Sequence, residues 1–317
     1  FVLFSHSDSL FFYLLRIYIN LKQNVGEIMD LMAYKEYLTQ GNFSENSVKS
    51  YIYDVKNFET YLRDEYGLDI IKTKKAHILT YLVAMQKSGK SSSTIIRTVS
   101  TLRNFFTFLK NEKLIEDNPV INIRSPKQIK KKPPILTEEE IGELMMLPDK
   151  NTFKGIRDLA MLELMYSSGI NVSELISIKI GQVNLSAGMI FIKGDKERII
   201  PLSKYANEAI SIYLNNFRKS EATNDDEYLF VNITGEPISR QGIWKMLKYY
   251  KRKMNLKKEL SPMVLRSSFA VHLLSHGADL GTLKELMGLN STGAAQHYLN
   301  NVEYKSLEVF KKTFPRS

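Results

Sequence analysis

The chain has 317 residues, 44% hydrophobic and 25% charged, which is ordinary for a globular protein and leaves room for two domains with separate cores. Lysine and arginine exceed aspartate and glutamate by 44 to 34, and the net charge of +10 favours a polyanion such as nucleic acid as the partner. A solvated basic surface would give the same charge. No cysteine is present, which excludes disulfides and thiolate metal sites, and the five histidines lack a metal-ligand spacing. We therefore expect no metal and no cofactor.

The first 28 residues differ from the rest of the chain. No stretch approaches the ~18 apolar residues of a membrane span, so we expect a cytoplasmic protein with no membrane partner. The chain opens with Phe1, and Met29 or Met32 directly precedes the first helical pattern. Residues 1–28 are therefore predicted to be a non-native or disordered leader from an overextended reading frame. A signal peptide is the alternative, but its basic n-region and small-residue cleavage site are missing.

Residues 29–117 carry helical patterns. Apolar residues recur every three or four positions from Ser44, a suitable N-cap, to Gly67, a suitable stop. A second stretch from Ser92 behaves in the same way, and shorter helices are indicated near 32–38 and 76–87. The pattern predicts a small all-helical domain.

The composition changes between Asn118 and Pro134. This segment reads NPVINIRSPKQIKKKPP, with three prolines after Pro119 and five positive charges without an acid. It predicts an extended, basic, proline-rich linker at 118–135. A solvated spacer is one interpretation, but positive charges on an extended chain can neutralise successive phosphates, so we favour contact with DNA. The residues expected to contribute most are Lys130, Lys131 and Lys132.

Residues 136–317 predict a second domain that is mainly helical with a small β-hairpin. Thr137 to Glu140 reads as a capping box that opens the domain. Helices are expected near 153–168, 173–179, 204–217, 239–254, 261–276, 279–288 and 302–314. Strands are expected near 188–193 and 197–202.

The stretch from Met263 to Tyr298 is the most informative part of the chain, and reads MVLRSSFAVHLLSHGADL, then LMGL, then AAQHY. It resembles the catalytic box of the tyrosine recombinases, or phage integrase family, which is written H-x-x-R, then G-H or G-W, then Y. Arg266 and Tyr298 match the arginine and the tyrosine. Met263 replaces the first histidine, and Leu289 replaces the second.

Two further segments carry the resemblance. The segment SGINVSEL is similar to T-G-L-R-V-S-E-L and has Asn171 at the position of a catalytic arginine. The segment IKGDKERIIPL is similar to G-K-G-N-K-E-R-x-V-P-L, whose first lysine corresponds to Lys193. The likeness runs from about residue 33 to the C-terminus and is greatest to the Xer-type recombinases. It implies a two-domain DNA clamp, in which a helical SAM-like core-binding domain precedes the catalytic domain.

The resemblance also implies a role for each matching residue. Tyr298 would attack a DNA phosphodiester and become joined to the 3′ phosphate. Arg266 would donate hydrogen bonds to the phosphoryl oxygens. Lys193 would protonate the leaving oxygen, and Glu174 would orient its neighbours.

Three positions depart from the family pattern. Asn171 carries no charge, Met263 cannot move a proton, and Leu289 cannot hydrogen-bond a phosphate. A transition-state arginine is worth ~10³–10⁵ in rate and a general acid-base group ~10²–10⁴, although such losses need not multiply. We therefore expect the chain's own cleavage activity to be weak or lost.

DNA binding is expected to be better preserved than cleavage. The segment ISRQGIW resembles the start of the family's major-groove helix, so Arg240 and Gln241 would reach bases or phosphates while Trp244 packs inward. A capped surface helix is the structural alternative. On the first domain, the expected phosphate contacts are Lys49, Arg97 and Arg103.

These patterns leave two main hypotheses open. One is a recombinase that cuts and rejoins DNA through Tyr298 despite three substitutions. The other, which we favour for present activity, is a catalytically silent DNA-binding partner of recombinase descent; a transcription regulator is a more distant possibility. In either case the expected partners are double-stranded DNA and further subunits, as a homo-tetramer or a hetero-tetramer with a related recombinase.

Overall fold

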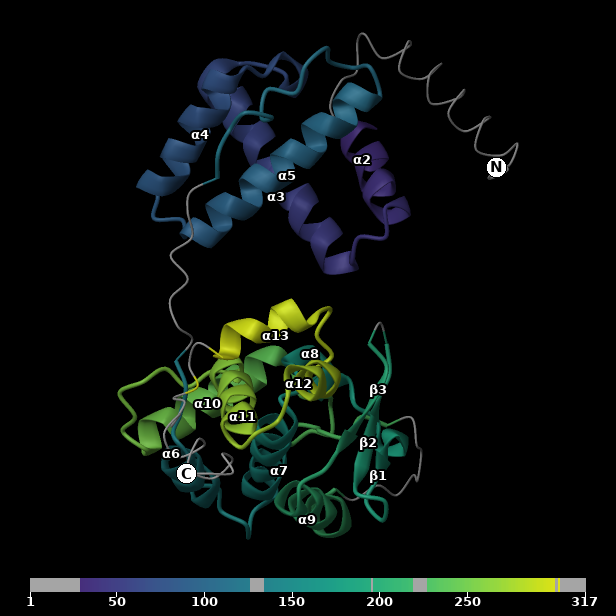
Figure 1. Cartoon of the computed structure of the whole chain (residues 1–317), viewed down its shortest axis with the longest axis vertical. Helices are drawn as coiled ribbons and strands as arrows, with labels where there is room; N and C mark the ends of the chain where they lie inside the picture. Colours follow the sequence, from purple (N-terminus) through teal and green to yellow (C-terminus); the bar gives the residue numbers. More distant parts are fainter. Residues whose placement is uncertain (1–28, 126–133, 195, 219–226, 300–301, 303–317) are drawn as a thin grey trace, which may run out of the picture. The chain divides into compact units, whose positions relative to one another are not determined.

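The computed structural model describes residues 29–125, 134–194, 196–218, 227–299 and 302. The predicted leader, the three linker lysines at 130–132 and all but the first residue of the helix predicted at 302–314 therefore lie outside the described residues. The chain divides into two compact units between Lys130 and Lys131 (Figure 1). Within the described ranges, no helix combines the length and the apolar character that crossing a bilayer requires.

The first unit is helical. Its described helices are α2 (Met29–Gln40), α3 (Glu45–Tyr66), α4 (Lys75–Lys87) and α5 (Ser92–Asn111), with a short 3₁₀ turn at Ile70–Lys72. Ser44 caps α3 by accepting from the Ser47 amide, and Gly67 ends the helix in the left-handed conformation. Both boundaries agree with the prediction from the sequence.

The core of the first unit extends past the predicted end of the domain. Apolar faces of α3 and α5, including Phe58, Leu102 and Phe105, meet in this core, and Val120 and Ile123 are buried in it as well. The Asn118 side chain holds this segment by donating to the Arg103 carbonyl and accepting from the Val120 amide. Residues 118–123 therefore pack on the first unit, although their composition suggested an extended linker.

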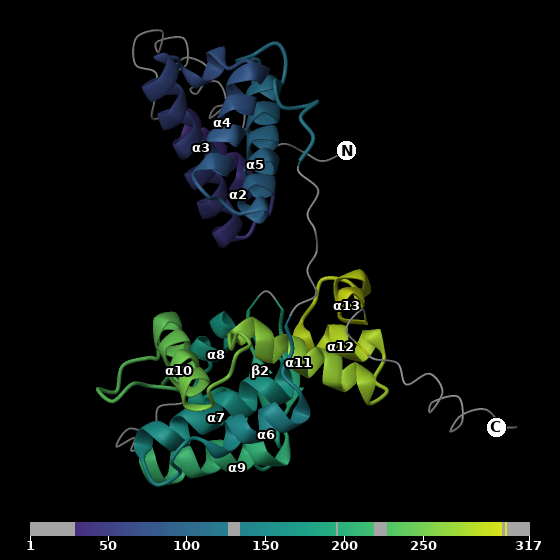
Figure 2. The same cartoon turned by 90° about the vertical axis from the view of Figure 1, so that its left-hand side faces the viewer.

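The second unit is mainly helical with a small sheet. Its described helices are α6 (Glu138–Met146), α7 (Phe153–Ser168), α8 (Val172–Ser177), α9 (Lys204–Ile212), α10 (Arg240–Lys253), α11 (Pro262–Ser275), α12 (Leu280–Met287) and α13 (Thr292–Leu299). Thr137 forms the predicted capping box with Glu140 at the start of α6. The buried helix α7 lies between α9 and α11 (Figure 2).

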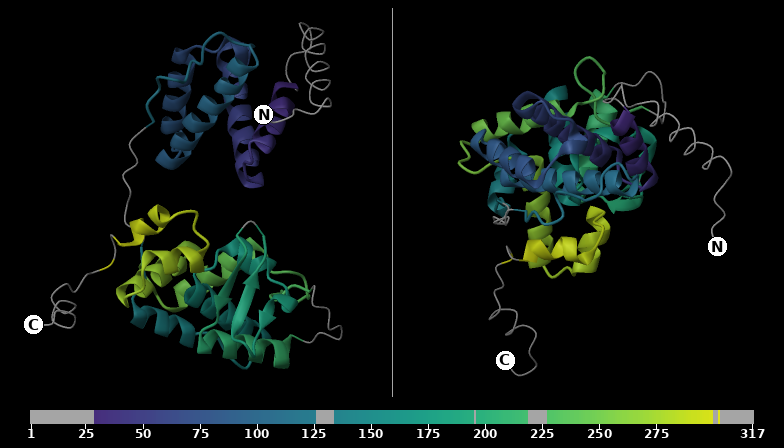
Figure 3. Two further views of the ribbon diagram at one scale, coloured as in Figure 1. Left: turned by 45° about the vertical axis from the view of Figure 1, so that its right-hand side comes forward. Right: turned by 90° about the horizontal axis from the view of Figure 1, so that it is seen from above.

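The described sheet has three antiparallel strands in the order β1 (Val183–Asn184), β2 (Met189–Ile192) and β3 (Arg198–Pro201) (Figure 3). The strands β2 and β3 form the predicted hairpin. The sequence did not predict β1, because two residues are too few to show an alternating pattern. Ile192 pairs with Arg198 at the end of the hairpin that faces α12.

Candidate active site

The position of the family's first arginine is occupied by a helix cap. Asn171 precedes α8, where its Oδ1 accepts from the Glu174 amide at 2.9 Å and its own amide donates to Glu174 Oε2 at 3.1 Å. This reciprocal capping box satisfies two backbone donors at the helix start. The Asn171 side chain is therefore held in place as the N-cap of α8, and it brings no positive charge.

Glu174 is held by an arginine that the sequence reasoning did not select. The Arg198 guanidinium, on β3, donates from Nη1 to Glu174 Oε1 at 2.8 Å and from Nη2 to Oε2 at 2.9 Å. The side chains are 9% and 15% exposed, so this bidentate ion pair is largely shielded from water. Burial raises the pKa of Glu174, but the hydrogen bonds from Arg198 and the Asn171 amide outweigh it, so the pKa lies below its usual value.

The sequence does contain a signal for Arg198. In the antiparallel hairpin Arg198 lies opposite the buried Ile192, and residues opposite each other point to the same face of a sheet. A charged residue at such a position has to find a partner within the protein. The signal becomes visible once the register of the hairpin is known.

Arg266, in the second turn of α11, is fixed by backbone carbonyls. Its Nη1 donates to the Gly169 carbonyl and its Nη2 to the Met287 carbonyl at 2.8 Å. Burial lowers the pKa of Arg266, while Tyr298 and the Glu174 carboxylate act in the opposite direction. Arg266 thus lies within electrostatic reach of both the expected nucleophile and the supporting carboxylate.

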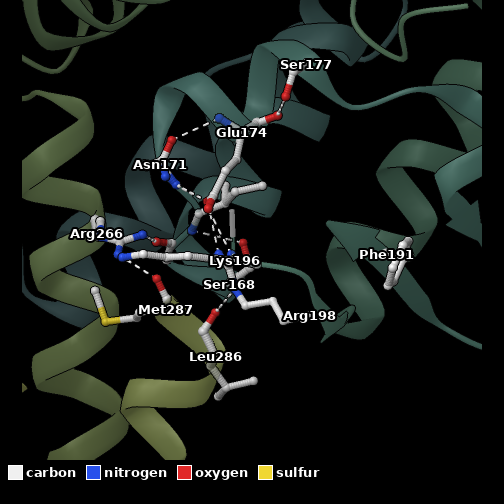
Figure 4. Close-up of polar contacts among 12 residues, drawn as sticks. Ser168, Asn171, Glu174, Ser177, Phe191, Lys196, Arg198, Arg266, Leu286 and Met287 are labelled. Atoms are coloured by element: carbon white, nitrogen blue, oxygen red, sulfur yellow. Dashed lines mark hydrogen bonds and ion pairs between the residues drawn. The ribbon is translucent and has the colours of Figure 1, made fainter. Parts of the chain in front are cut away.

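The two arginines meet at the end of one helix. Arg198 Nε donates to the Leu286 carbonyl at 2.8 Å, one residue before the carbonyl that Arg266 contacts (Figure 4). These carbonyls lie at the C-terminus of α12, where the helix dipole favours positive charge. The next residue, Gly288, has φ of +61°, and a Cβ there would lie 2.8 Å from Arg198 Nη1, so glycine is needed for this close approach.

Tyr298 lies on α13 and is only 4% exposed. It packs in a cluster with Phe269 of α11 and Leu283 of α12. The ring of the adjacent His297 lies 3.9 Å from the Tyr298 ring, centroid to centroid, and His297 Nδ1 contacts the Ala294 carbonyl at 2.6 Å. The structure thus places the expected nucleophile next to Arg266, in a buried position.

The remaining catalytic positions are dispersed around this centre. Lys193 is exposed and follows directly after β2. Met263 lies in the first turn of α11 with 62% of its surface exposed. Leu289 is half-buried against the cluster that contains Tyr298, and it also lines a pocket of about 450 Å³ that Arg198 borders. Position 263 therefore presents a thioether to solvent, and position 289 presents an aliphatic side chain to the pocket.

The predicted phosphate contacts on the first unit have partners within that unit. Arg97 forms a bidentate pair with the buried Asp54 at 3.0 and 2.8 Å. Arg103 donates to the Ile123 carbonyl at 2.7 Å. Lys49 pairs with Glu45 one turn earlier, and both side chains are largely exposed. Lys49 can therefore exchange its partner for a phosphate easily, whereas Arg97 and Arg103 also support the fold.

On the second unit, α10 begins as predicted with Ser239 as its cap. Arg240 donates to Ser173 Oγ at 2.5 Å, and Gln241 lines a shallow pocket of about 510 Å³ with Trp244, Lys245 and Lys248. The prediction that Trp244 packs inward is wrong, because the side chain is 51% exposed. The apolar stripe of α10 is formed instead by Ile243, Met246, Leu247 and Tyr250, and Trp244 lies about 100° around the helix from Ile243.

Comparison with known proteins accounts for most of the chain. Residues 134–304 match the model of the phage integrase family, and residues 31–113 match that of the phage integrase N-terminal SAM-like domain. The chain is 37% identical over 293 residues to the tyrosine recombinase XerD of Staphylococcus haemolyticus, covering 89% of this chain and 98% of that protein. It is also 37% identical over 278 residues to XerD of Halalkalibacterium halodurans, covering 86% and 93%. The chain belongs to the phage integrase family. Within that family it is a Xer-type tyrosine recombinase homologue, as the motifs predicted.

Solved structures agree with this fold. The XerH recombinase bound to a palindromic difH substrate matches with a TM-score of 0.70 at 20% identity, covering 83% of this chain and 78% of that chain. A lambda integrase dimer bound to a core site matches with a TM-score of 0.66 at 18% identity, covering 85% and 93%. The SAM-like domain followed by a recombinase catalytic domain is therefore confirmed as the fold of this Xer-type chain.

Proposed function

We propose that this Xer-type protein binds double-stranded DNA as part of a recombinase tetramer and that its own strand-cleaving activity is weak or lost. The observation that carries the second part is the capping box of α8. Asn171 stands where the family has an arginine, and its side chain caps a helix without carrying a charge. A phosphate at this site would meet Arg266 without the first arginine of the family pair.

The chemistry that remains can be assigned residue by residue. The Tyr298 oxygen would attack phosphorus and form a 3′-phosphotyrosyl bond as the bond from phosphorus to the 5′ oxygen breaks. Lys193 would give a proton to that leaving oxygen, and Arg266 would stabilise the charge on the non-bridging oxygens. The proton that Tyr298 loses would pass to water, because Met263 and Leu289, which stand where the family has histidines, have no titratable group. The lost arginine corresponds to ~10³–10⁵ in rate, or about 4–7 kcal/mol.

Several features support DNA as the partner. The chain carries a net charge of +10, and structural relatives include recombinases bound to DNA. The proposed DNA contacts are Lys49, the linker lysines 130–132, Arg240 and Gln241, with Arg97 and Arg103 contributing where their internal bonds allow. The two units would close on the duplex as a clamp. With chromosomal or mobile-element DNA as its partner, the protein would act in the cytoplasm.

The second candidate function is a catalytically silent architectural partner, or a transcription regulator, of recombinase descent. The observation that favours it is that Met263 is exposed and Leu289 is apolar at two positions where the family has proton-handling residues. In a mixed tetramer, a related recombinase would cut the DNA, and this chain would bind its own half of the recombination site without cutting.

The experiment that tests the proposal is SDS-resistant capture of sheared genomic DNA from the native host. The full chain, Tyr298→Phe, and the triple variant Asn171→Arg, Met263→His, Leu289→His are compared, with non-covalent binding measured in the same DNA pool. We expect specific fragments to bind the parent chain and to be released by SDS. Abundant SDS-resistant fragments from the parent, absent with Tyr298→Phe, would contradict the loss of cleavage. Absence of sequence-specific binding would contradict the DNA-binding function.

A further inference from the structure

We propose that Arg198 keeps the site around Arg266 positively charged by neutralising Glu174, at a site where Asn171 brings no charge. The inference rests on the proposed function for the identity of its ligand, a phosphate group of DNA. It assigns Arg198 as a positioning residue that acts through Glu174.

The charges around Arg266 show why such a residue is needed. Glu174 interacts electrostatically with Arg266, and its carboxylate is ionised at neutral pH because its pKa is lowered. Without another cation, one carboxylate would neutralise one guanidinium, and a phosphate would find no net charge to bind. Arg198 takes both carboxylate oxygens of Glu174, so the three side chains together keep one net positive charge.

The geometry gives Arg198 a fixed place. Besides Glu174, its guanidinium holds the Leu286 carbonyl, next to the Met287 carbonyl that Arg266 holds. Arg198 therefore joins β3, α8 and the end of α12, three elements that border the site. Because β3 follows the hairpin end that carries Lys193, the same contacts also fix the strand pair that presents this lysine.

A pocket lies beside Arg198, and its lining does not include Arg266. It measures about 450 Å³, and its lining includes Lys196 and Lys284, two acidic residues, Glu197 and Glu285, and the apolar Leu289. Position 289 offers no hydrogen-bond donor, so the basic side chains must supply the attraction for an anion. Arg198 is the basic residue of this lining that also contacts Glu174.

The test uses the full chain with inorganic phosphate as the probe, at constant ionic strength. The shift of the melting temperature with phosphate concentration is measured for the parent, Arg198→Gln, Arg198→Lys, Glu174→Gln, and Glu174→Gln with Arg198→Gln. Arg266→Gln serves as the loss control. The matched control is Arg218→Gln, which breaks an equally short ion pair at 2.8 Å with Glu227 elsewhere in the unit.

We expect Arg198→Gln to weaken phosphate binding about tenfold or more, because the Glu174 carboxylate would then neutralise Arg266 and leave the site without a net positive charge. The double variant is expected to regain most of the response, because it removes the carboxylate that Arg198 neutralises. Glu174→Gln alone should bind phosphate more tightly than the parent, and Arg198→Lys should retain part of the response. Arg218→Gln should behave like the parent.

Three results would overturn the proposal: a parent chain without a phosphate response, an undiminished response in Arg198→Gln, or a double variant that fails to recover. If Arg198→Gln does not fold, the comparison of Glu174→Gln with the parent decides, because the proposal requires Glu174→Gln to bind phosphate more tightly than the parent does. A merely structural role for Arg198 would lower the melting temperature without changing its dependence on phosphate. The variants could show the expected order of phosphate responses while the chain shows no sequence-specific DNA binding. That result would contradict the proposed function but support the role of Arg198.

Discussion

Arg198 and Arg266 donate to neighbouring carbonyls, those of Leu286 and Met287, in the last turn of α12. One guanidinium comes from a β-strand and the other from a helix, so the end of α12 fixes how far apart these charges lie. Helix C-termini stabilise cations, and here two backbone carbonyls of one helix end each hold a guanidinium, with Glu174 as the further partner of Arg198. The charge arrangement of the site therefore depends on how α12 ends, as much as on which residues carry charge.

Gly169→Ala is expected to destabilise the second unit strongly. Gly169 ends α7 at φ of +57°. A Cβ there would lie 2.4 Å from Phe269 Cδ1, which is shorter than a van der Waals contact between two carbon atoms. Overpacking costs about 1–3 kcal/mol and the left-handed conformation about 1 kcal/mol more. Urea denaturation should show the combined loss. Gly188→Ala, at φ of +64° with open space around its Cβ, is the control and should lose only the conformational part; equal losses would contradict the role of Phe269.

Asn171→Arg is expected to restore charge at the cost of stability. The substitution removes the side-chain oxygen that caps α8, and loss of such a cap costs about 0.5–2 kcal/mol. In return, it places a second guanidinium in the position of the family arginine. Thermal unfolding should show the loss, and SDS-resistant DNA capture by this variant should exceed that of the parent. A variant as stable as the parent would show that the capping box contributes little.

Arg97→Ala is expected to destabilise the first unit much more than Lys49→Ala. Arg97 pairs with the buried Asp54, and after its removal Thr101 would still donate a hydrogen bond to the Asp54 carboxylate. Removing one partner of a buried charge costs about 3–5 kcal/mol, and the partial exposure of Arg97 reduces this figure. The pair of Lys49 with Glu45 is exposed, so its loss should cost under about 1 kcal/mol. Similar denaturation midpoints for the two variants would refute this ranking.

The second unit is expected to lose stability in acid partly through Glu174. The folded-state pKa of Glu174 lies below its ordinary value of 4.5, so its contribution is present above pH 4.5 and is lost as pH falls through the folded pKa. Glu174→Gln should therefore be less stable than the parent at neutral pH and should lose less stability below about pH 4.5. Denaturation measured across this range checks the sign. If the free energy of unfolding fell with pH equally in the two proteins, the pKa of Glu174 would not differ between the folded and unfolded states.

Local signals in the sequence predicted the helices well. Ser44 and Gly67 marked both ends of α3 because a cap and a left-handed stop act through neighbouring backbone groups, which are visible within a few residues of sequence. The same reason explains the capping box at Thr137. The motifs also predicted the family, and the structure brings Arg266 near Tyr298 and Glu174 as the motifs require.

Contacts between distant segments could not be predicted in this way. Arg198 is 24 residues from Glu174 and 88 from Leu286, so its role depends on the hairpin register and on where α12 ends. Arg97 was predicted to face DNA because its pairing with Asp54 on another helix leaves no local pattern. Trp244 was placed inward from its apolar character, although the helix buries Ile243 and Met246 instead.

Tyr298 does not belong to the main hydrophobic core of the second unit. Tyr298 packs in a small cluster formed by α11, α12 and α13, distinct from the larger cluster around α7. Fewer buried side chains hold this cluster than the main one, so we expect it to open at a lower free energy than global unfolding requires. On this expectation, local opening of α13 would expose the tyrosine hydroxyl while the main core stays folded, and a partner that holds α13 in place would delay that exposure.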